Sequence, residues 1–183
     1  MFLKDGDPKK YCGPKPHAEE ALYQLATGLE YIHKLQLIHC DLKPKNVLIW
    51  IGNSSVVVLK WTNFGSSKQV DEKGSCPIIE IKGTLEWLAP EISEMLEKEE
   101  SNQSENQATL LRQSHTFKSD VFAEGLVFGY FLLGGVHPFG SIGWKILTNI
   151  NKGDAIYLNS KSCALGKGNA FYINTKTCQF SIS

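Results

Sequence analysis

Arginine is almost absent from this sequence of 183 residues, in which Arg112 is the only arginine among 19 basic side chains. Arginine grips a carboxylate or a phosphate with two parallel hydrogen bonds, so recognition of that kind is almost excluded. An excess of charge is lacking as well, because 19 acidic side chains balance the basic ones. Without a net positive charge there is no general attraction to nucleic acid or to an anionic membrane, and we expect no nucleic acid partner.

Long apolar runs and regularly spaced cysteines are also lacking. The apolar start of the chain is broken at Lys4, and no later run reaches the length of a membrane span, so we expect neither a secretory leader nor a membrane segment. An odd, scattered set of cysteines without a C-x-x-C pair indicates reduced thiols, and hence a cytoplasmic location. The five are Cys12, Cys40, Cys76, Cys163 and Cys178.

What the sequence does contain is enough apolar surface for one globular domain, with 42% hydrophobic and 21% charged residues. Residues 1–15 are rich in lysine, glycine, proline and aspartate and are expected to form a flexible lead-in. A helix is predicted from Pro16 to Lys34, because proline suits a first turn and apolar residues then recur at helical spacing. These residues are Ala18, Leu22, Leu25, Leu29 and Ile32.

Two further patterns predict the centre of the domain. The β-branched runs at residues 47–51 and 56–59, separated by a polar turn, are typical of a β-hairpin. Residues 120–133 are apolar on nearly every side, so a helix there must be buried in the middle of the domain. Asp120, at the start of this stretch, could simply cap the helix.

Three other stretches carry no sustained periodicity. Residues 63–91 are expected to form a functional loop, followed by a short helix near residues 92–96. Residues 97–116 are polar and are expected to form a mobile insert. Residues 157–183 have few apolar anchors and are assigned no element. A Gly-Lys-Gly sequence within them lacks the third glycine of a nucleotide-binding loop and predicts a surface turn.

Three motifs follow one another in a recognisable order and at a recognisable spacing. They read His39-Cys40-Asp41-Leu42-Lys43-Pro44-Lys45-Asn46, then Asn63-Phe64-Gly65, then Gly83-Thr84-Leu85-Glu86-Trp87-Leu88-Ala89-Pro90-Glu91. This ordered set resembles the catalytic half of a eukaryotic protein kinase. With Asp120-Val121-Phe122 and His137-Pro138-Phe139-Gly140, it is similar to the inositol-requiring enzymes, endoplasmic-reticulum stress sensors that join a serine/threonine kinase to an endoribonuclease.

The resemblance implies an α+β fold, mainly α, of the protein-kinase-like large lobe, with helices and short β-hairpins over residues 16–156. No glycine loop and no Val-Ala-x-Lys strand precede Pro16. We therefore expect the small lobe, which covers ATP, and the last helices of the large lobe to be missing. The sensor, the membrane span and the nuclease of the inositol-requiring enzymes match no part of the chain and are not carried over.

The resemblance also implies roles for the motif residues. As catalytic residues, Asp41 would accept the proton of the substrate hydroxyl and Lys43 would approach the transferred phosphate. Asn46 and the residue at position 63 would hold Mg²⁺ on ATP, which makes ATP and Mg²⁺ the implied cofactors. The Asp-Leu-Lys-Pro-x-Asn string points to serine/threonine substrates. Structural support is implied for five residues: His39, Phe64, Gly65, Glu91, and Asp120, which would orient the backbone around His39.

The residue at position 63 departs from the family pattern, because Asn63 stands where the family has aspartate. Magnesium favours charged oxygen, so a neutral amide oxygen is a poorer ligand. Since a bound metal supplies on the order of several kcal/mol of charge stabilisation, we expect a loss of several tenfold steps in rate and weak binding of ATP and Mg²⁺. A slow reaction with the amide carbonyl as the metal ligand is the alternative.

Two more positions bear on regulation and stability. Cys40 stands where the family has an arginine that grips a phosphorylated loop, so we expect no switching by loop phosphorylation. Cys40 itself is either a small buried filler or a redox cysteine of low pKa. Glu91 lacks its usual arginine partner after Arg112. It is therefore either buried without a partner, which costs about 3–5 kcal/mol, or exposed without penalty.

Three functional hypotheses follow. The first is a serine/threonine-kinase-like fragment with impaired or absent phosphoryl transfer. The second is a pseudokinase interaction module that docks on a complete related kinase and regulates it. The third is a truncated product without a stable fold, whose bare apolar patches favour aggregation or partner binding.

Overall fold

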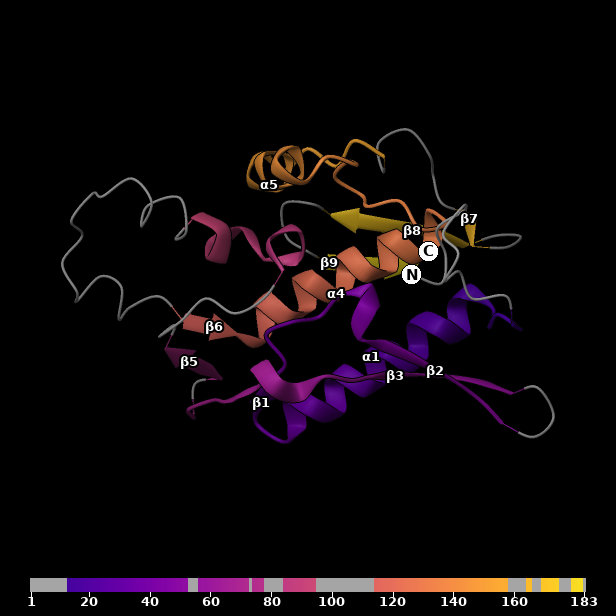
Figure 1. The fold of residues 1–183 in the computed structure, drawn as a ribbon, viewed down its shortest axis with the longest axis horizontal. Helices are drawn as coiled ribbons and strands as arrows, with labels where there is room; N and C mark the ends of the chain where they lie inside the picture. Colours follow the sequence, from indigo (N-terminus) through magenta and orange to yellow (C-terminus); the bar gives the residue numbers. More distant parts are fainter. Residues whose placement is uncertain are drawn as a thin grey trace.

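The computed structural model describes residues 13–52, 56–72, 74–77, 84–94, 114–157, 164–165, 169–174 and 179–182. The elements shown in Figure 1 are α1 (Ala18–Lys34), β1 (Leu37–Ile38), β2 (Val47–Ile51), β3 (Val57–Trp61), β4 (Lys68–Gln69), β5 (Ser75–Pro77), β6 (Ser114–Thr116), α4 (Phe117–Leu132), α5 (Gly143–Lys152), β7 (Ala164–Leu165), β8 (Asn169–Asn174) and β9 (Gln179–Ile182). The three long elements are helices and the strands form small antiparallel sheets, as the expected α+β fold requires.

Helix α1 confirms the first helix prediction, although it begins at Ala18 rather than at Pro16. Its buried side chains recur every three or four residues and include Leu22, Leu25, Leu29 and Ile32, so one apolar stripe faces the core. This stripe contacts α4 and β3. The amphipathic pattern of the sequence therefore determines which face of α1 is buried.

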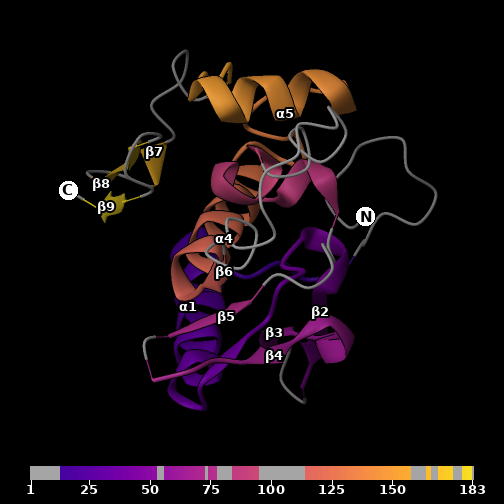
Figure 2. The same cartoon turned by 90° about the vertical axis from the view of Figure 1, so that its left-hand side faces the viewer.

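Helix α4 lies between α1 on one side and α5 on the other, as Figures 1 and 2 both show. It is buried along most of its length, which confirms the prediction of a central helix. One hydrophobic core forms between α4, α1 and β3, and a second between α4, α5 and residues 88–92. The cap is Thr116, whose side chain and that of Ser119 form a capping box. Asp120 therefore lies in the first turn and does not serve as the N-cap.

Glu124 is an ionisable residue in an otherwise apolar part of α4. It is 7% exposed, and its Oε1 atom has no hydrogen-bond partner among the described residues. Burial, followed by the negative charge of Asp120 one turn away, raises the pKa of Glu124 to about 8. The core therefore favours the neutral, protonated form of Glu124.

The predicted hairpin is formed by β2 and β3, which pair antiparallel with Ile49 opposite Leu59. Its inner face is tied to α1, because the indole of Trp61 donates to the carbonyl of Leu25 at 3.0 Å. Its outer face is apolar but uncovered in the described part of the chain, with Leu48 and Trp50 each more than half exposed. The hairpin thus anchors the segment between the first two motifs on helix α1.

Other elements differ from the sequence-based expectations. Strands β4 and β5 lie in the expected loop 63–91, and β6, which pairs with β5, takes the last residues of the expected insert 97–116. Residues 90–94 are helical, slightly earlier than expected. Helix α5 was not predicted, and strands β7, β8 and β9 form a sheet in the stretch that was left unassigned.

Parts of those expectations fall outside the described residues. They are the lead-in up to residue 12, most of the insert 97–116 and the glycine turn at residues 166–168. Among the residues that the structure describes, no helix is long and apolar enough to span a membrane.

Candidate active site

The loop that carries the first motif follows β1 and is held by a buried carboxylate from α4. Asp120 accepts hydrogen bonds from the backbone N–H of His39 at 2.7 Å and of Cys40 at 3.0 Å. The ring Nε2 of His33, on α1, lies 3.0 Å from the same carboxylate. Cys40 adopts a φ of 64°, which is unfavourable for a residue with a side chain. Three partners on one carboxylate fix the loop in this strained shape.

His39 connects this loop to the second motif. It is fully buried, and its Nε2 atom lies 3.0 Å from the carbonyl oxygen of Thr62. Its ring also contacts the ring of Phe64, with 5.1 Å between the centroids. The N–H of Asp41 points back to Nδ1 of His39 at 3.3 Å. One imidazole therefore sets the position of Asp41 relative to the Asn63-Phe64-Gly65 turn.

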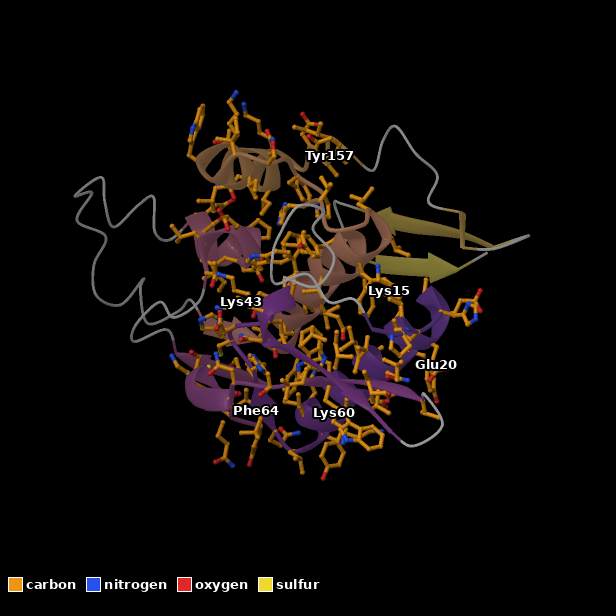
Figure 3. The ribbon with its side chains drawn as sticks, turned by 45° about the vertical axis from the view of Figure 1, so that its right-hand side comes forward. Lys15, Glu20, Lys43, Lys60, Phe64 and Tyr157 are labelled. Atoms are coloured by element: carbon orange, nitrogen blue, oxygen red, sulfur yellow. The ribbon has the colours of Figure 1, made fainter. Side chains whose placement is uncertain are left out.

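Asp41 and Lys43 form a largely buried ion pair. The ammonium of Lys43 donates to both carboxylate oxygens of Asp41, at 2.8 and 2.7 Å. It also donates to the hydroxyl of Thr84 at 2.7 Å, which joins the loop to the third motif. The side chain of Asp41 is 8% exposed and that of Lys43 is 17% exposed. A carboxylate and an ammonium thus lie side by side next to the third motif, and Figure 3 labels Lys43.

Asn46 and Asn63 meet through their side-chain amides. Asn46 donates from Nδ2 to the backbone oxygen of Asp41 at 2.6 Å and to its carboxylate at 3.0 Å. Asn63 donates from Nδ2 to Oδ1 of Asn46 at 3.2 Å. Asn63 has a φ of 68°, a left-handed conformation that asparagine tolerates better than most residues. The structure therefore brings Asp41, Lys43, Asn46 and Asn63 into one cluster.

The sequence matches the protein kinase domain family over residues 3–164. The chain belongs to this family. Protein kinase domains generally use ATP and Mg²⁺.

Three relatives show where the chain stands within the protein kinase domain family. The sensor for unfolded proteins in the ER ire1 of Schizosaccharomyces pombe is 36% identical over 130 residues, which is 66% of this chain and 12% of the relative. The human serine/threonine-protein kinase/endoribonuclease IRE2 is 38% identical over 128 residues, 67% of this chain and 12% of the relative. Leucine-rich repeat serine/threonine-protein kinase 1 of Mus musculus is 31% identical over 137 residues, 74% of this chain and 6% of the relative.

These matches confirm the resemblance of this kinase domain to the inositol-requiring enzymes. The first two relatives are of that type. A third protein of this type, the serine/threonine-protein kinase/endoribonuclease IRE1 of Hypocrea jecorina, is 30% identical to the aligned part of the chain. The chain spans only 12% of the length of the first two. What the complete relatives do beyond this segment is therefore not transferred to the chain.

The residues of this kinase domain do not fit Mg²⁺ well. The two positions that would hold the ion carry neutral amides, and the Oδ1 atom of Asn46 already accepts a hydrogen bond from Asn63. The nearest carboxylate, Asp41, is occupied by Lys43 on both oxygens. Among the described residues, no three histidine, cysteine or acidic side chains form a group that could hold a metal ion. A hard dication prefers charged oxygen ligands, and the one carboxylate in this cluster is already paired with Lys43.

Cys40 is not a cysteine of low pKa. Burial, followed by the negative charge of Asp120, raises the pKa of the Cys40 thiol to about 12. The thiol is 7% exposed and packs with Ile38 and Cys76. Of the two interpretations of Cys40, the structure favours the small buried side chain.

Glu91 lies at the surface of the kinase domain. The structure places it among the exposed residues, so its carboxylate remains in water. The penalty of about 3–5 kcal/mol for a buried unpaired charge therefore does not arise. Arg112 lies outside the described residues.

Sequence reasoning missed two residues that shape this site. Thr84 receives the ammonium of Lys43, which is 41 residues away, and His33 supports Asp120 from α1. Neither contact has a local spacing that a sequence could reveal. Thr84 belongs to the third motif that the sequence revealed, but its contact with Lys43 was not predicted.

Proposed function

We propose that this chain is a serine/threonine-protein-kinase domain in which phosphoryl transfer is strongly impaired. The observation that carries the proposal is the hydrogen bond between the amides of Asn63 and Asn46 at 3.2 Å. Two neutral amides that satisfy each other stand where the family places a carboxylate opposite the asparagine. A cation placed there would compete with this bond and would gain only neutral oxygen ligands from the two amides.

The rest of the site retains the parts that position a hydroxyl substrate. Asp41 is fixed by His39 and Asn46 and can accept a hydroxyl proton from a side chain at hydrogen-bond distance. Both of its oxygens are now held by Lys43, so Lys43 must release one of them before Asp41 can act. Transfer therefore depends on an anionic group that draws Lys43 away, and ATP would supply the phosphoryl group.

Restoring the carboxylate tests the proposal. The variant Asn63→Asp is expected to show a rise in melting temperature of a few degrees on addition of MgCl₂ and ATP, because a ligand that binds the native state stabilises it. The wild-type chain is expected to show no such shift, and neither is the matched control Asn63→Gln, which keeps a neutral amide. Ordinary turnover by the wild-type chain on a basic protein substrate, measured with radiolabelled ATP, would overturn the proposal.

A second candidate function is that of an interaction module that regulates a complete related kinase. A groove of about 530 Å³ runs between α1 and β3, and its lining includes Tyr31, Trp61 and Phe64. Figure 3 shows Phe64 and Lys60 of this lining at the same end of the molecule. Tyr31 is 64% exposed and Phe64 is 48% exposed. Such an apolar surface favours a protein partner.

Binding measurements separate this candidate from the first. Sedimentation of the purified chain with the kinase segment of a complete relative should give a one-to-one complex that Tyr31→Glu abolishes. Trp144→Ser, on the exposed face of α5, is the matched control and should leave the complex intact. If neither the wild-type chain nor the Trp144→Ser variant forms a complex, the interaction module is excluded. If the purified chain shows no cooperative melt, the truncated product is the remaining hypothesis.

A further inference from the structure

Two buried thiols meet beside the catalytic loop. Cys40 and Cys76 are 36 positions apart in the sequence (76 − 40), and both are free cysteines buried in one small cluster with Ile38. The two side chains pack in this cluster, and each thiol influences the pKa of the other. Their side chains are thus in direct contact across two separate segments of the chain.

Each thiol is carried by a backbone that is held in place. The N–H of Cys40 is bound by Asp120, and Cys76 lies on β5, where it pairs with His115 of β6. Residues opposite each other on antiparallel strands point to the same face, so His115 shares the face of Cys76. His115 is 2% exposed, and its Nε2 atom has no hydrogen-bond partner among the described residues. An unpaired polar atom in such a place requires an explanation.

A small cavity adjoins the thiol of Cys40. Its volume is about 20 Å³, and its lining includes Cys40, Asp41, Thr84 and His115. A cavity of this size holds one water-sized molecule, provided that polar groups are available to bind it. Cys40 therefore borders a space of about the size of one water molecule.

We propose that Cys40 and Cys76 form a disulfide when a peroxide oxidises the protein, which joins the catalytic loop covalently to β5. In the first step one thiol attacks the peroxide, becomes a sulfenic acid and releases water or an alcohol. In the second step the other thiol displaces the sulfenic hydroxyl, which leaves as water, and the S–S bond forms. The two thiols lose two electrons in total, and the peroxide gains them. This modification site does not depend on the proposed loss of phosphoryl transfer.

The reaction is slow, and its rate depends on pH. The thiolate is the reactive form, and burial raises the pKa of both thiols, that of Cys40 to about 12. Asp120 and Asp71 disfavour the thiolates, while Lys68 favours them. Burial lowers the pKa of His115, which therefore stands neutral beside the pair. Below the thiol pKa values the rate should rise about tenfold per pH unit.

The disulfide would close a loop that contains Asp41, Lys43, Asn46 and Asn63. A cross-link over such a length removes freedom from the unfolded chain and stabilises the folded one. We expect the melting temperature to rise by about 5–10 °C on oxidation and to return after treatment with dithiothreitol. In a reducing compartment the bond would persist only under oxidative conditions.

Peptide mapping of the whole chain tests the inference. The native protein is incubated with hydrogen peroxide at pH 8.5, remaining thiols are alkylated in denaturant, and the digest is analysed without reduction. The expected result is a linked peptide pair containing Cys40 and Cys76, together with the rise in melting temperature. Cys40→Ser and Cys76→Ser should each remove both effects, and the matched control Cys12→Ser should keep both.

The wild-type map decides the question even if a serine variant fails to fold. If Cys40 and Cys76 are recovered as free thiols, as sulfinic or sulfonic acids, or linked only to other cysteines, the inference is wrong. A sample oxidised in guanidinium chloride should lose the preference for this pair, because the unfolded chain does not hold the two thiols together. If the same pair dominates there, folding does not select it and the inference fails.

Discussion

The loop that carries the first motif (residues 39–46) and the Asn63 turn belong to the same cluster but are held in very different ways. The loop is buried, and its backbone is fixed by two N–H bonds to the carboxylate of Asp120, which the ring of His33 also contacts. The turn is exposed, and the amide of Asn63 makes a single bond to Asn46. Losing the charge at position 63 therefore costs the fold little, whereas losing Asp120 would leave buried donors unpaired. Within this chain, Asp120 is a buried support of the fold, whereas Asn63 lies in an exposed turn.

The largest test of this comparison is Asp120→Ala. Removing the carboxylate leaves the N–H groups of His39 and Cys40 without acceptors in a buried site, and we expect a loss of about 3–5 kcal/mol in the free energy of unfolding. Urea unfolding followed by circular dichroism measures it. Asp120→Asn, which keeps one acceptor oxygen, should lose less. A loss below about 1 kcal/mol for the alanine variant would contradict the role of Asp120.

Glu124→Gln sharpens the comparison. Glu124 lies one turn from Asp120, but its replacement should raise the free energy of unfolding, whereas replacement of Asp120 should lower it. The raised pKa of about 8 means that the folded chain keeps its proton while the unfolded chain, with the ordinary value of 4.5, loses it. The wild-type chain should therefore lose stability as the pH rises from about 4.5 to 8.

The glutamine variant should be more stable than the wild type by about 2–4 kcal/mol at pH 8 and should lack this pH dependence. Thermal melts of both proteins at pH 5, 6.5 and 8 measure the difference. Glu94→Gln, on an exposed residue, serves as the control and should change neither the stability nor its pH dependence. Parallel curves for wild type and Glu124→Gln would show that Glu124 is ionised in the folded protein.

A smaller effect is expected in the exposed turn. Asn63→Ala should cost about 1 kcal/mol, because alanine tolerates a φ of 68° less well than asparagine. Asn63→Gly should stay within about 0.5 kcal/mol of the wild type, since glycine adopts this conformation freely. Denaturant unfolding distinguishes the two. Equal losses for both variants would mean that the amide hydrogen bond, and not the backbone conformation, stabilises the turn.

The smallest effect belongs to Glu91→Gln. Because Glu91 is exposed, we expect the free energy of unfolding to change by less than about 0.5 kcal/mol. A loss of 2 kcal/mol or more in a urea titration would instead show that Glu91 has a buried partner.

The elements that sequence periodicity predicted are the long ones. The stripe of α1, the all-round apolar character of α4 and the β-branched hairpin each extend over enough residues for a pattern to repeat. Strands β4, β5 and β6 have two or three residues each, and long-range pairing determines where they form. Helix α5 offered a weak signal, with Ile146 and Ile150 four residues apart and Gly153 in a left-handed conformation after its end.

The candidate site was predictable as a set of residues but not as a set of contacts. The motif spacing indicated Asp41, Lys43, Asn46 and Asn63, and the structure brings these four together. That Lys43 also reaches Thr84 depends on how distant segments pack, which no local pattern contains. The exposure of Glu91 likewise depends on packing and could only be left as one of two alternatives.

Strand β6 ends at Thr116 and helix α4 begins at the next residue, so the strand runs directly into the helix. Asp120 lies four residues past this junction and holds the backbone of Cys40. The same carboxylate also accepts from the backbone N–H of His39, so two consecutive residues before Asp41 are held by α4. The segment around Asp41 and the β5–β6 ribbon are thus linked through a short stretch of chain and a single carboxylate.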